Sequence, residues 1–129
     1  MGQPAAKQGD KIVATDMHLI QPPPVASPVL MPHPFTGILD GSLSSDVTIM
    51  GRPAATQGST ATNTPPHVPS GGSFVKPPSN QGTIQTGSAS VKINGKPAAR
   101  SGDTARTCND PSDLPMGTVV AVGTVFIGG

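Results

Sequence analysis

Three histidines and one cysteine are the side chains of this sequence best suited to chemistry. His18, His33 and His67 are all of its histidines, and Cys108 is its single cysteine. Imidazole nitrogens and a thiolate sulfur bind Zn²⁺ at about 2.0–2.1 Å and 2.3 Å, and four such donors form the closed tetrahedral shell of a structural site. The alternative is that the histidines are solvated loop residues and the cysteine is a small buried hydrophobe.

A repeat organises the chain, and its period defines the structural unit in which these residues must be placed. The segments GQPAAKQGD, GRPAATQGS and GKPAARSGD begin at Gly2, Gly51 and Gly95. Each contains the triplet Pro-Ala-Ala, followed by a glycine that permits a turn that a Cβ would block. The triplets occupy residues 4–6, 53–55 and 97–99.

One potential metal ligand follows each triplet. His18 and His67 lie nine residues after the closing glycine of their repeats, and Cys108 lies six residues after its own. If the repeats surround a pseudo-three-fold axis, the loops after the triplets converge on that axis. His33 belongs to the proline-rich insert of the first repeat and has no counterpart in the others. The register predicts a structural metal site of His18, His33, His67 and Cys108, with Zn²⁺ favoured over iron.

Short strands are predicted beside the triplets. Residues 47–49, 91–93 and 125–127 each carry a valine and an isoleucine separated by one other residue, the period of a half-buried strand. Asn94-Gly95 is a strong signal for a tight hairpin turn. The first triplet has no strand before it and the last strand has no triplet after it. We therefore expect the end of the chain to pair with its start, which would close three units around the axis.

Composition limits how such a chain can be stabilised. The sequence has 16 glycines, 16 prolines and only 2% aromatic residues, so a large two-layer core is not expected. We predict one all-β domain over residues 1–129: a small pseudo-three-fold arrangement of short β-hairpins with little or no helix. Further strands are expected at 36–39, 82–87 and 117–123, each as a partner of the valine-isoleucine strand in its unit, with 87–90 as the connecting turn.

Two proline-rich inserts, 19–36 and 63–81, interrupt the first and second units. Their proline density predicts extended or polyproline-like conformation. Asp10, Ser59 and Asp103 occupy matching positions after the triplets. Because Asp and Ser interchange readily as turn-capping residues, we expect these three residues to be structural.

Several functions are excluded by what the sequence lacks. A net charge of +1 with scattered basic residues gives no support for nucleic-acid binding. The chain contains no glutamate, and no nucleophile elbow, zinc-protease or phosphate-loop motif, so we expect no enzymatic activity. No apolar run is long enough for a transmembrane helix, and the start lacks the features of a signal peptide. We expect synthesis in the cytoplasm and export by another route.

The repeat resembles the proline-alanine-alanine-arginine (PAAR) family. Residues 97–100 spell PAAR, residues 4–7 PAAK and residues 53–56 PAAT, and Gly87–Asp103 fits the wider family pattern closely. The resemblance implies a small β-structured cone that caps the trimeric β-helical spike of contractile injection machines, including type VI secretion systems and phage-like tails. It also implies a metal near the apex, carried over here to His18, His33, His67 and Cys108.

This resemblance implies a structural piercing tip, one monomer per spike trimer, delivered outside the cell or into a target cell. We expect the base of the cone to contact the spike through Val91, Ile93, Val125 and Ile127. Contact with the target membrane would be transient. The alternative is an adaptor that recruits effector cargo through the inserts 19–36 and 63–81. A metal-dependent hydrolase is a weaker third possibility, because it would need an open coordination position and a general base.

Overall fold

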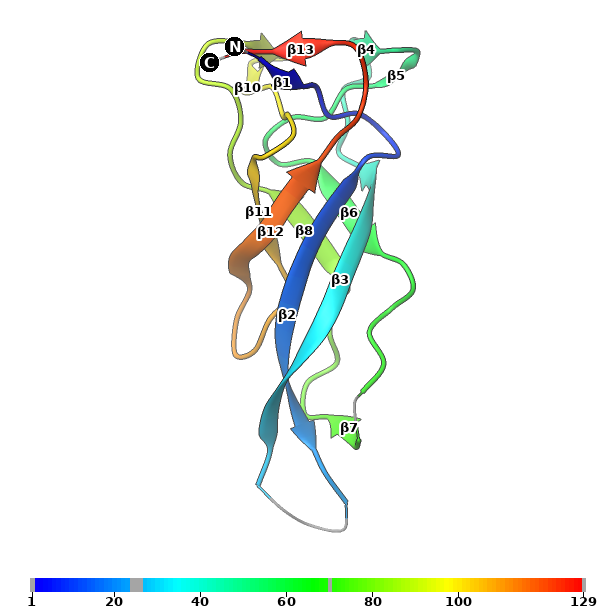
Figure 1. The fold of residues 1–129 in the computed structure, drawn as a ribbon, viewed down its shortest axis with the longest axis vertical. Helices are drawn as coiled ribbons and strands as arrows, with labels where there is room; N and C mark the ends of the chain where they lie inside the picture. Colours follow the sequence, from blue (N-terminus) through cyan, green and yellow to red (C-terminus); the bar gives the residue numbers. More distant parts are fainter. Residues whose placement is uncertain (1, 24–26, 70, 129) are drawn as a thin grey trace.

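The computed structural model describes residues 2–23, 27–69 and 71–128, and every regular element in that part of the chain is a β-strand. The molecule is elongated and tapers from a wide end, which holds both chain ends, to a narrow end formed by one long hairpin (Figure 1). None of the described residues forms a helix that could cross a membrane. The predicted all-β class is confirmed.

A six-stranded antiparallel barrel forms the middle of the molecule. Its strands follow the order β2-β3-β6-β8-β11-β12, and β12 pairs back onto β2 to close it. A closed barrel has no free strand edge within the ring. Each repeat contributes one neighbouring pair, which gives the pseudo-three-fold arrangement. The barrel strands are β2 (Lys11–Gln21), β3 (Val29–Gly41), β6 (Thr60–Asn63), β8 (Gln81–Ile84), β11 (Thr104–Thr107) and β12 (Leu114–Val120).

Three two-residue ladders form the wide end. Met50-Gly51 and Asn94-Gly95 adopt positive φ and connect the first two as tight turns. The third has no covalent turn, because it pairs Gln3 at the start of the chain with Ile127 near its end, as the repeat predicts. The ladders join β4 (Thr48–Ile49) to β5 (Arg52–Pro53), β9 (Lys92–Ile93) to β10 (Lys96–Pro97), and β13 (Phe126–Ile127) to β1 (Gln3–Pro4).

A ring of backbone hydrogen bonds joins the three triplets between the wide end and the barrel. The N–H of Ala6 donates to the carbonyl of Ala99 at 3.0 Å, Ala99 donates to Ala55 at 3.1 Å, and Ala55 donates back to Ala6 at 3.0 Å. All three alanines are fully buried, so the backbones approach where a larger side chain would separate them. The second and third residues of the triplet are therefore small because the axis is narrow there.

Turn residues after the triplets act as the sequence predicts. The carboxylates of Asp10 and Asp103 accept hydrogen bonds from the backbone N–H groups of Lys7 and Arg100, at 3.0 and 2.8 Å. In the second repeat, the Ser59 hydroxyl accepts the corresponding bond from Thr56. An equivalent turn is thus capped by either residue type, which confirms a structural role.

The barrel interior is filled around one ring. Phe35 on β3 is almost fully buried, and a Cβ added at Gly37 would lie 2.7 Å from it. Gly82 also faces this ring, and a Cβ added there would lie 3.2 Å from the aromatic edge. Glycines in the wall therefore make room for Phe35, the largest of the fully buried side chains among the described residues, which explains how a chain poor in aromatic residues fills its barrel.

Three predictions about pairing are wrong. Residues 36–39, 82–87 and 117–123 do not pair with the valine-isoleucine strands of their own units. Residues 36–39 belong to β3, which pairs with β2 and β6. β8 pairs instead with β6 and β11, and β12 with β11 and β2. The valine-isoleucine strands pair only with the residues that run into each triplet. Closing the barrel requires contacts between units, and such contacts leave no trace in a local sequence pattern.

The first insert, 19–36, is extended, as one of the two predicted alternatives has it, and is mostly regular strand and not polyproline-like chain. Leu19–Gln21 belong to β2 and residues 29–36 to β3, so the insert forms part of a long hairpin that was not predicted. Met17 and Leu19 direct their N–H groups to the side chains of Asn109 and Asp110 and not to β3. The pairs that they make with β3 are consequently non-hydrogen-bonded.

Proline is tolerated at such positions because no ladder bond requires its missing N–H. Pro32 lies opposite Met17. Pro34 lies opposite Thr15, two residues along, and is therefore also at a non-hydrogen-bonded pair. The neighbouring strand β6 pairs only with residues 37–41 of β3, so the outer side of β3 is unpaired beside both prolines. Alternating prolines are therefore compatible with this strand.

Candidate metal centre

All four predicted ligands lie together in the narrow half of the molecule, defined here as the lower parts of β2 and β3 with the loops 64–80 and 108–113 (Figure 1). His18 projects inward from β2 and His33 from β3, whereas His67 lies in the loop after β6 and Cys108 follows β11 directly. The prediction that one ligand of each repeat would come from the loop after its triplet is wrong for His18, which lies on β2. Strand alternation, with Ile12 and Ile20 also inward, explains the inward direction of His18.

The separations among His18, His67 and Cys108 suit a single ion, whereas His33 lies beside them but is not in the group whose donor atoms are closest together. The sulfur of Cys108 lies 3.7 Å from Nε2 of His18. The ring centroids of His18, His33 and His67 lie 5.0 to 5.6 Å apart. Donor atoms of Asp16, His18, His67 and Cys108 all lie within 4.8 Å of one another. This buried group is close enough to bind a metal and is compatible with Zn²⁺.

His33 has the bonding pattern of a metal ligand. Its Nδ1 donates to the carbonyl of Met31 at 2.9 Å, which leaves the lone pair on Nε2. That Nε2 is buried and has no hydrogen-bond partner among the described residues. A ring nitrogen fixed by a backbone carbonyl, with its other nitrogen directed at the ion, is the usual arrangement of a metal-binding histidine.

His18 is held neutral by its surroundings. Burial lowers the pKa of its imidazole, and the carboxylate of Asp110 acts in the opposite direction with a smaller effect. Oδ2 of Asp110 lies 3.5 Å from Nδ1 of His18 and accepts a hydrogen bond from the backbone of Leu19. A neutral ring keeps a lone pair for a metal at physiological pH. Nδ1 of His18 is buried and has no hydrogen-bond partner among the described residues.

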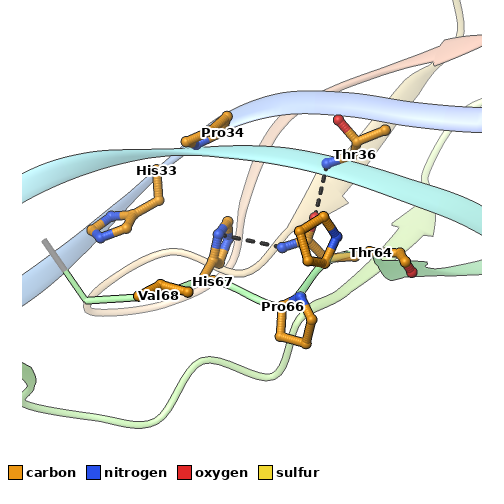
Figure 2. A pocket seen from close by; sticks show the side chains of 9 residues that line it. His33, Pro34, Thr36, Thr64, Pro66, His67 and Val68 are labelled. Carbon is orange, nitrogen blue, oxygen red and sulfur yellow. Dashed lines mark hydrogen bonds between the residues drawn. The ribbon is translucent and has the colours of Figure 1, made fainter.

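His67 lies across a cavity of about 280 Å³ from His33, and Figure 2 shows the two rings approaching from the loop and from β3. Its Nδ1 lies 3.3 Å from the side-chain nitrogen of Asn63, and its Nε2 lies 2.9 Å from Oδ2 of Asp16. Asn63 is fixed in turn because its carbonyl oxygen accepts the N–H of Thr36 at 2.9 Å. The loop is thus positioned by amide side chains that the sequence alone did not single out.

Cys108 is nearly fully buried, and its environment opposes ionisation without a cation. Burial and then the Asp16 carboxylate raise the pKa of the thiol to about 11, against hydrogen bonds from the Asn80 backbone and the Ser79 side chain. A bound divalent ion reverses this balance, because coordination deprotonates a thiol outright. The cysteine is therefore protonated in the absence of a cation and would become a thiolate on binding a metal.

Two phenylalanines enclose the histidines. The Phe35 ring lies 6.0 Å from His67 on the barrel side. Phe74, on the short strand β7 (Ser73–Phe74) that pairs with the end of β2, lies 5.7 Å from His18 and 5.5 Å from His33. An apolar surround limits access of water to a metal site and lowers the local dielectric constant. The second insert, 63–81, thus supplies both His67 and part of this enclosure.

Sequence reasoning missed Asp16, which is fully buried in this cluster. One signal was available: Asp16 and His18 are two residues apart on a predictable strand, so their side chains must face the same side. The role of Asn63 and Phe74 could not be found in this way, because their contacts depend on the path of loop 64–80.

The sequence comparisons agree with this architecture. The family described as PAAR motif matches two overlapping segments, residues 30–108 and 75–129, which together cover most of the chain. The chain therefore belongs to the PAAR motif family, whose members are spike-tip proteins of contractile injection systems with a structural role. Membership implies association with a spike protein. The search of curated proteins found no match to this chain.

Proposed function

We propose that this chain is a metal-stabilised point that caps a trimeric spike, one monomer per trimer, and helps the spike to puncture a target membrane. The observation that carries the proposal is the buried cluster of imidazole and thiol donors inside the narrow half, opposite a three-fold wide end. The proposed ion is Zn²⁺ and the proposed ligands are His18, His33, His67 and Cys108. The role is structural, without turnover.

The ion would act as a cross-link between segments that are distant in sequence. Its ligands come from β2, β3, the loop 64–80 and the residue after β11, so one ion would tie three repeats together. Structural Zn²⁺ supplies folding free energy directly, and apparent values of about 10–16 kcal/mol are typical of small zinc domains. A point built mainly from one hairpin and two loops would gain its rigidity in this way.

The wide end is the proposed contact for the spike. Its pseudo-three-fold ladders would let one chain cover the three-fold end of a trimer. Val91 and Val125 are 37% and 41% exposed there, which supports the predicted contact. Ile93 and Ile127 are only 8% and 7% exposed, because they pack with Ile49 and the triplet alanines in a small internal cluster. Their role in spike binding is therefore proposed as support for the surface and not as direct contact.

Pull-down with the cognate spike tests this function. The double variant Val91→Asp, Val125→Asp should lose binding, because it places two charges in an apolar interface. Val68→Asp is the matched control, since Val68 is 74% exposed in the loop 64–80, away from the wide end. Unaltered binding by the double variant counts against the proposed contact. Elemental analysis of the wild-type protein that finds no stoichiometric metal refutes the metal centre.

Recruitment of effector cargo through 19–36 and 63–81 stays a prediction. Shortening the outer part of the β2–β3 hairpin should leave spike assembly intact and remove cargo if the adaptor function holds. Synthesis in the cytoplasm and delivery by the injection machine are likewise proposed. Fractionation of secreting and non-secreting cells would test them.

A further inference from the structure

The carboxylate of Asp16 is fully buried, and both of its oxygens accept hydrogen bonds. It is 0% exposed, and its only ion-pair partner among the described residues is His67, with neither lysine nor arginine beside it. Oδ1 accepts hydrogen bonds from the hydroxyl of Thr107 at 2.5 Å and from the amide of Asn109 at 3.4 Å. These bonds fix the plane of the carboxylate and turn Oδ2 toward the histidines. A buried anion without a compensating cation is costly, so its presence requires an explanation.

Oδ2 accepts its hydrogen bonds from two of the proposed metal ligands. Nε2 of His67 lies 2.9 Å away and the sulfur of Cys108 lies 3.4 Å away. An ion bound at these two atoms takes the place of both hydrogens. Oδ2 would then have lost its donors while staying fully buried, unless it binds the same ion.

The separations around Oδ2 also match those of donors that share one ion. Bond lengths of about 2.0–2.3 Å place two donors on one Zn²⁺ roughly 3–4 Å apart. Oδ2 to Cys108 sulfur is 3.4 Å, and Cys108 sulfur to His18 Nε2 is 3.7 Å. The 2.9 Å between Oδ2 and His67 Nε2 is at the short limit of this range.

Charge gives an independent argument. A divalent ion with one thiolate and neutral imidazoles leaves a net positive charge in a buried site. One carboxylate makes the centre neutral, which removes most of the cost of burying it. The described residues contain no other carboxylate whose oxygen lies within the donor group.

We propose that Asp16 is a direct ligand of the metal through Oδ2, which adds a fifth donor to His18, His33, His67 and Cys108. This inference rests on the proposed metal centre. It makes the centre a neutral five-donor site and not a closed tetrahedron of three imidazoles and one thiolate.

Co²⁺ substitution tests the coordination number, because five-coordinate Co²⁺ absorbs visible light more weakly than tetrahedral Co²⁺. The wild-type protein should show weak visible bands together with a thiolate-to-cobalt charge-transfer band. In Asp16→Asn the visible bands should become stronger, and Zn²⁺ affinity measured by chelator competition should fall by more than about 100-fold. Asp110→Asn is the matched control: it removes a buried carboxylate beside His18 and should stay within the 10–100-fold typical of outer-shell changes, with an unchanged spectrum.

Strong tetrahedral bands in the wild-type protein would overturn the proposal. So would an Asp16→Asn variant whose spectrum is unchanged and whose affinity falls no further than that of Asp110→Asn, because Asp16 would then only position His67. If Asp16→Asn does not fold, X-ray absorption of the Zn²⁺-loaded wild type decides between four and three nitrogen or oxygen donors beside the single sulfur. A wild-type chain that takes up no metal overturns the metal centre itself, which is a different result from the others.

Discussion

The wide end and the narrow half of this molecule are built on opposite principles. At the wide end three repeats form nearly identical ladders, and backbone groups make the joining bonds, as in the ring of Ala6, Ala55 and Ala99. In the narrow half the repeats contribute unequal sets of side chains, and the clustered groups are imidazoles, a thiol and a carboxylate. Backbone bonds repeat because every residue carries the same groups. A metal site does not need symmetry, only donors at suitable distances.

This contrast predicts that the two regions respond differently to change. Metal-site substitutions should act through one strong interaction, whereas wide-end substitutions should act through steric fit and backbone conformation. Four experiments follow, in decreasing order of expected effect.

The largest effect should come from the double variant Cys108→Ser, His67→Ala. It removes two proposed ligands from different repeats, so the ion would lose its cross-link between them. Metal content should fall below stoichiometric amounts, and Tm should fall by more than about 10 °C, since each kcal/mol is worth roughly 3–5 °C in a chain of this size. Calorimetry with elemental analysis measures both. A variant that loses its metal and keeps its Tm would show that the narrow half is stable without the ion.

The metal-free protein should lose stability at high pH. The folded thiol of Cys108 has a pKa of about 11 against 9.0 for an unperturbed thiol. A group whose pKa is raised by folding contributes stability that is complete below the unfolded pKa and is lost as pH rises through the folded one. Unfolding free energy should therefore decrease between pH 9 and 11, by at most about 3 kcal/mol.

Denaturant titrations across this pH range provide the measurement. Cys108→Ser is the control, because its hydroxyl does not ionise there and should show a smaller decrease. The metal-loaded wild type should also be less sensitive, since its sulfur is already a bound thiolate. Equal pH dependence in all three proteins would contradict the assignment.

Overpacking should disturb the wide end without removing the metal. Ala99→Leu adds a large side chain to the alanine ring, where exposure is 0%, and should cost about 1–3 kcal/mol. Ala89→Leu, at an exposed position, should cost almost nothing. Metal stoichiometry should be unchanged in both variants. Loss of metal from Ala99→Leu would mean that the two regions are coupled more tightly than their separate bonding suggests.

The smallest effect should come from a turn glycine. Gly95 has φ of +77° with open space around it, so Gly95→Ala should cost about 1 kcal/mol through backbone strain alone. Gly128→Ala is the matched control, because no neighbouring atom lies near its added Cβ and its φ is outside the left-handed region. Urea unfolding of both variants would measure the difference. Equal costs would show that the hairpin turn does not constrain the ladder.

The sequence predicts the wide end well because its signals are local. The Asn94-Gly95 turn and the pairing of Gln3 with Ile127 follow from short patterns that recur in a fixed frame. Barrel pairing could not be predicted in the same way, because β8 pairs with β6 across a long insert and with β11 of the next repeat, and neither pairing is indicated by a local pattern. The prolines of β3 obscured this strand in the sequence. Only the register of the ladder shows that Pro32 and Pro34 lie at positions where no N–H is needed for a hydrogen bond to β2.

The proposed ligands were found from repeat register, and the structure brings their side chains together. Asp16 could have been found from the sequence, because it shares an inward face with His18 on β2. The contacts of Asn63 and Phe74 could not be found from the sequence, since they depend on the path of loop 64–80, which carries no periodic signal. Residue type and repeat register therefore indicated the proposed donors, and only the three-dimensional structure showed which side chains contact them.

The ladder without a covalent turn has a practical consequence for engineering. Gly2 and Gly128 both belong to the wide end, where the other two ladders have their turns (Figure 1). A short linker that joins Gly128 to Gly2 would give this ladder the turn that it lacks, and opening the chain at Met50-Gly51 should then give a circular permutant with the same ladders. A passenger domain fused at either site would leave the molecule beside the wide end and would not blunt the opposite extremity.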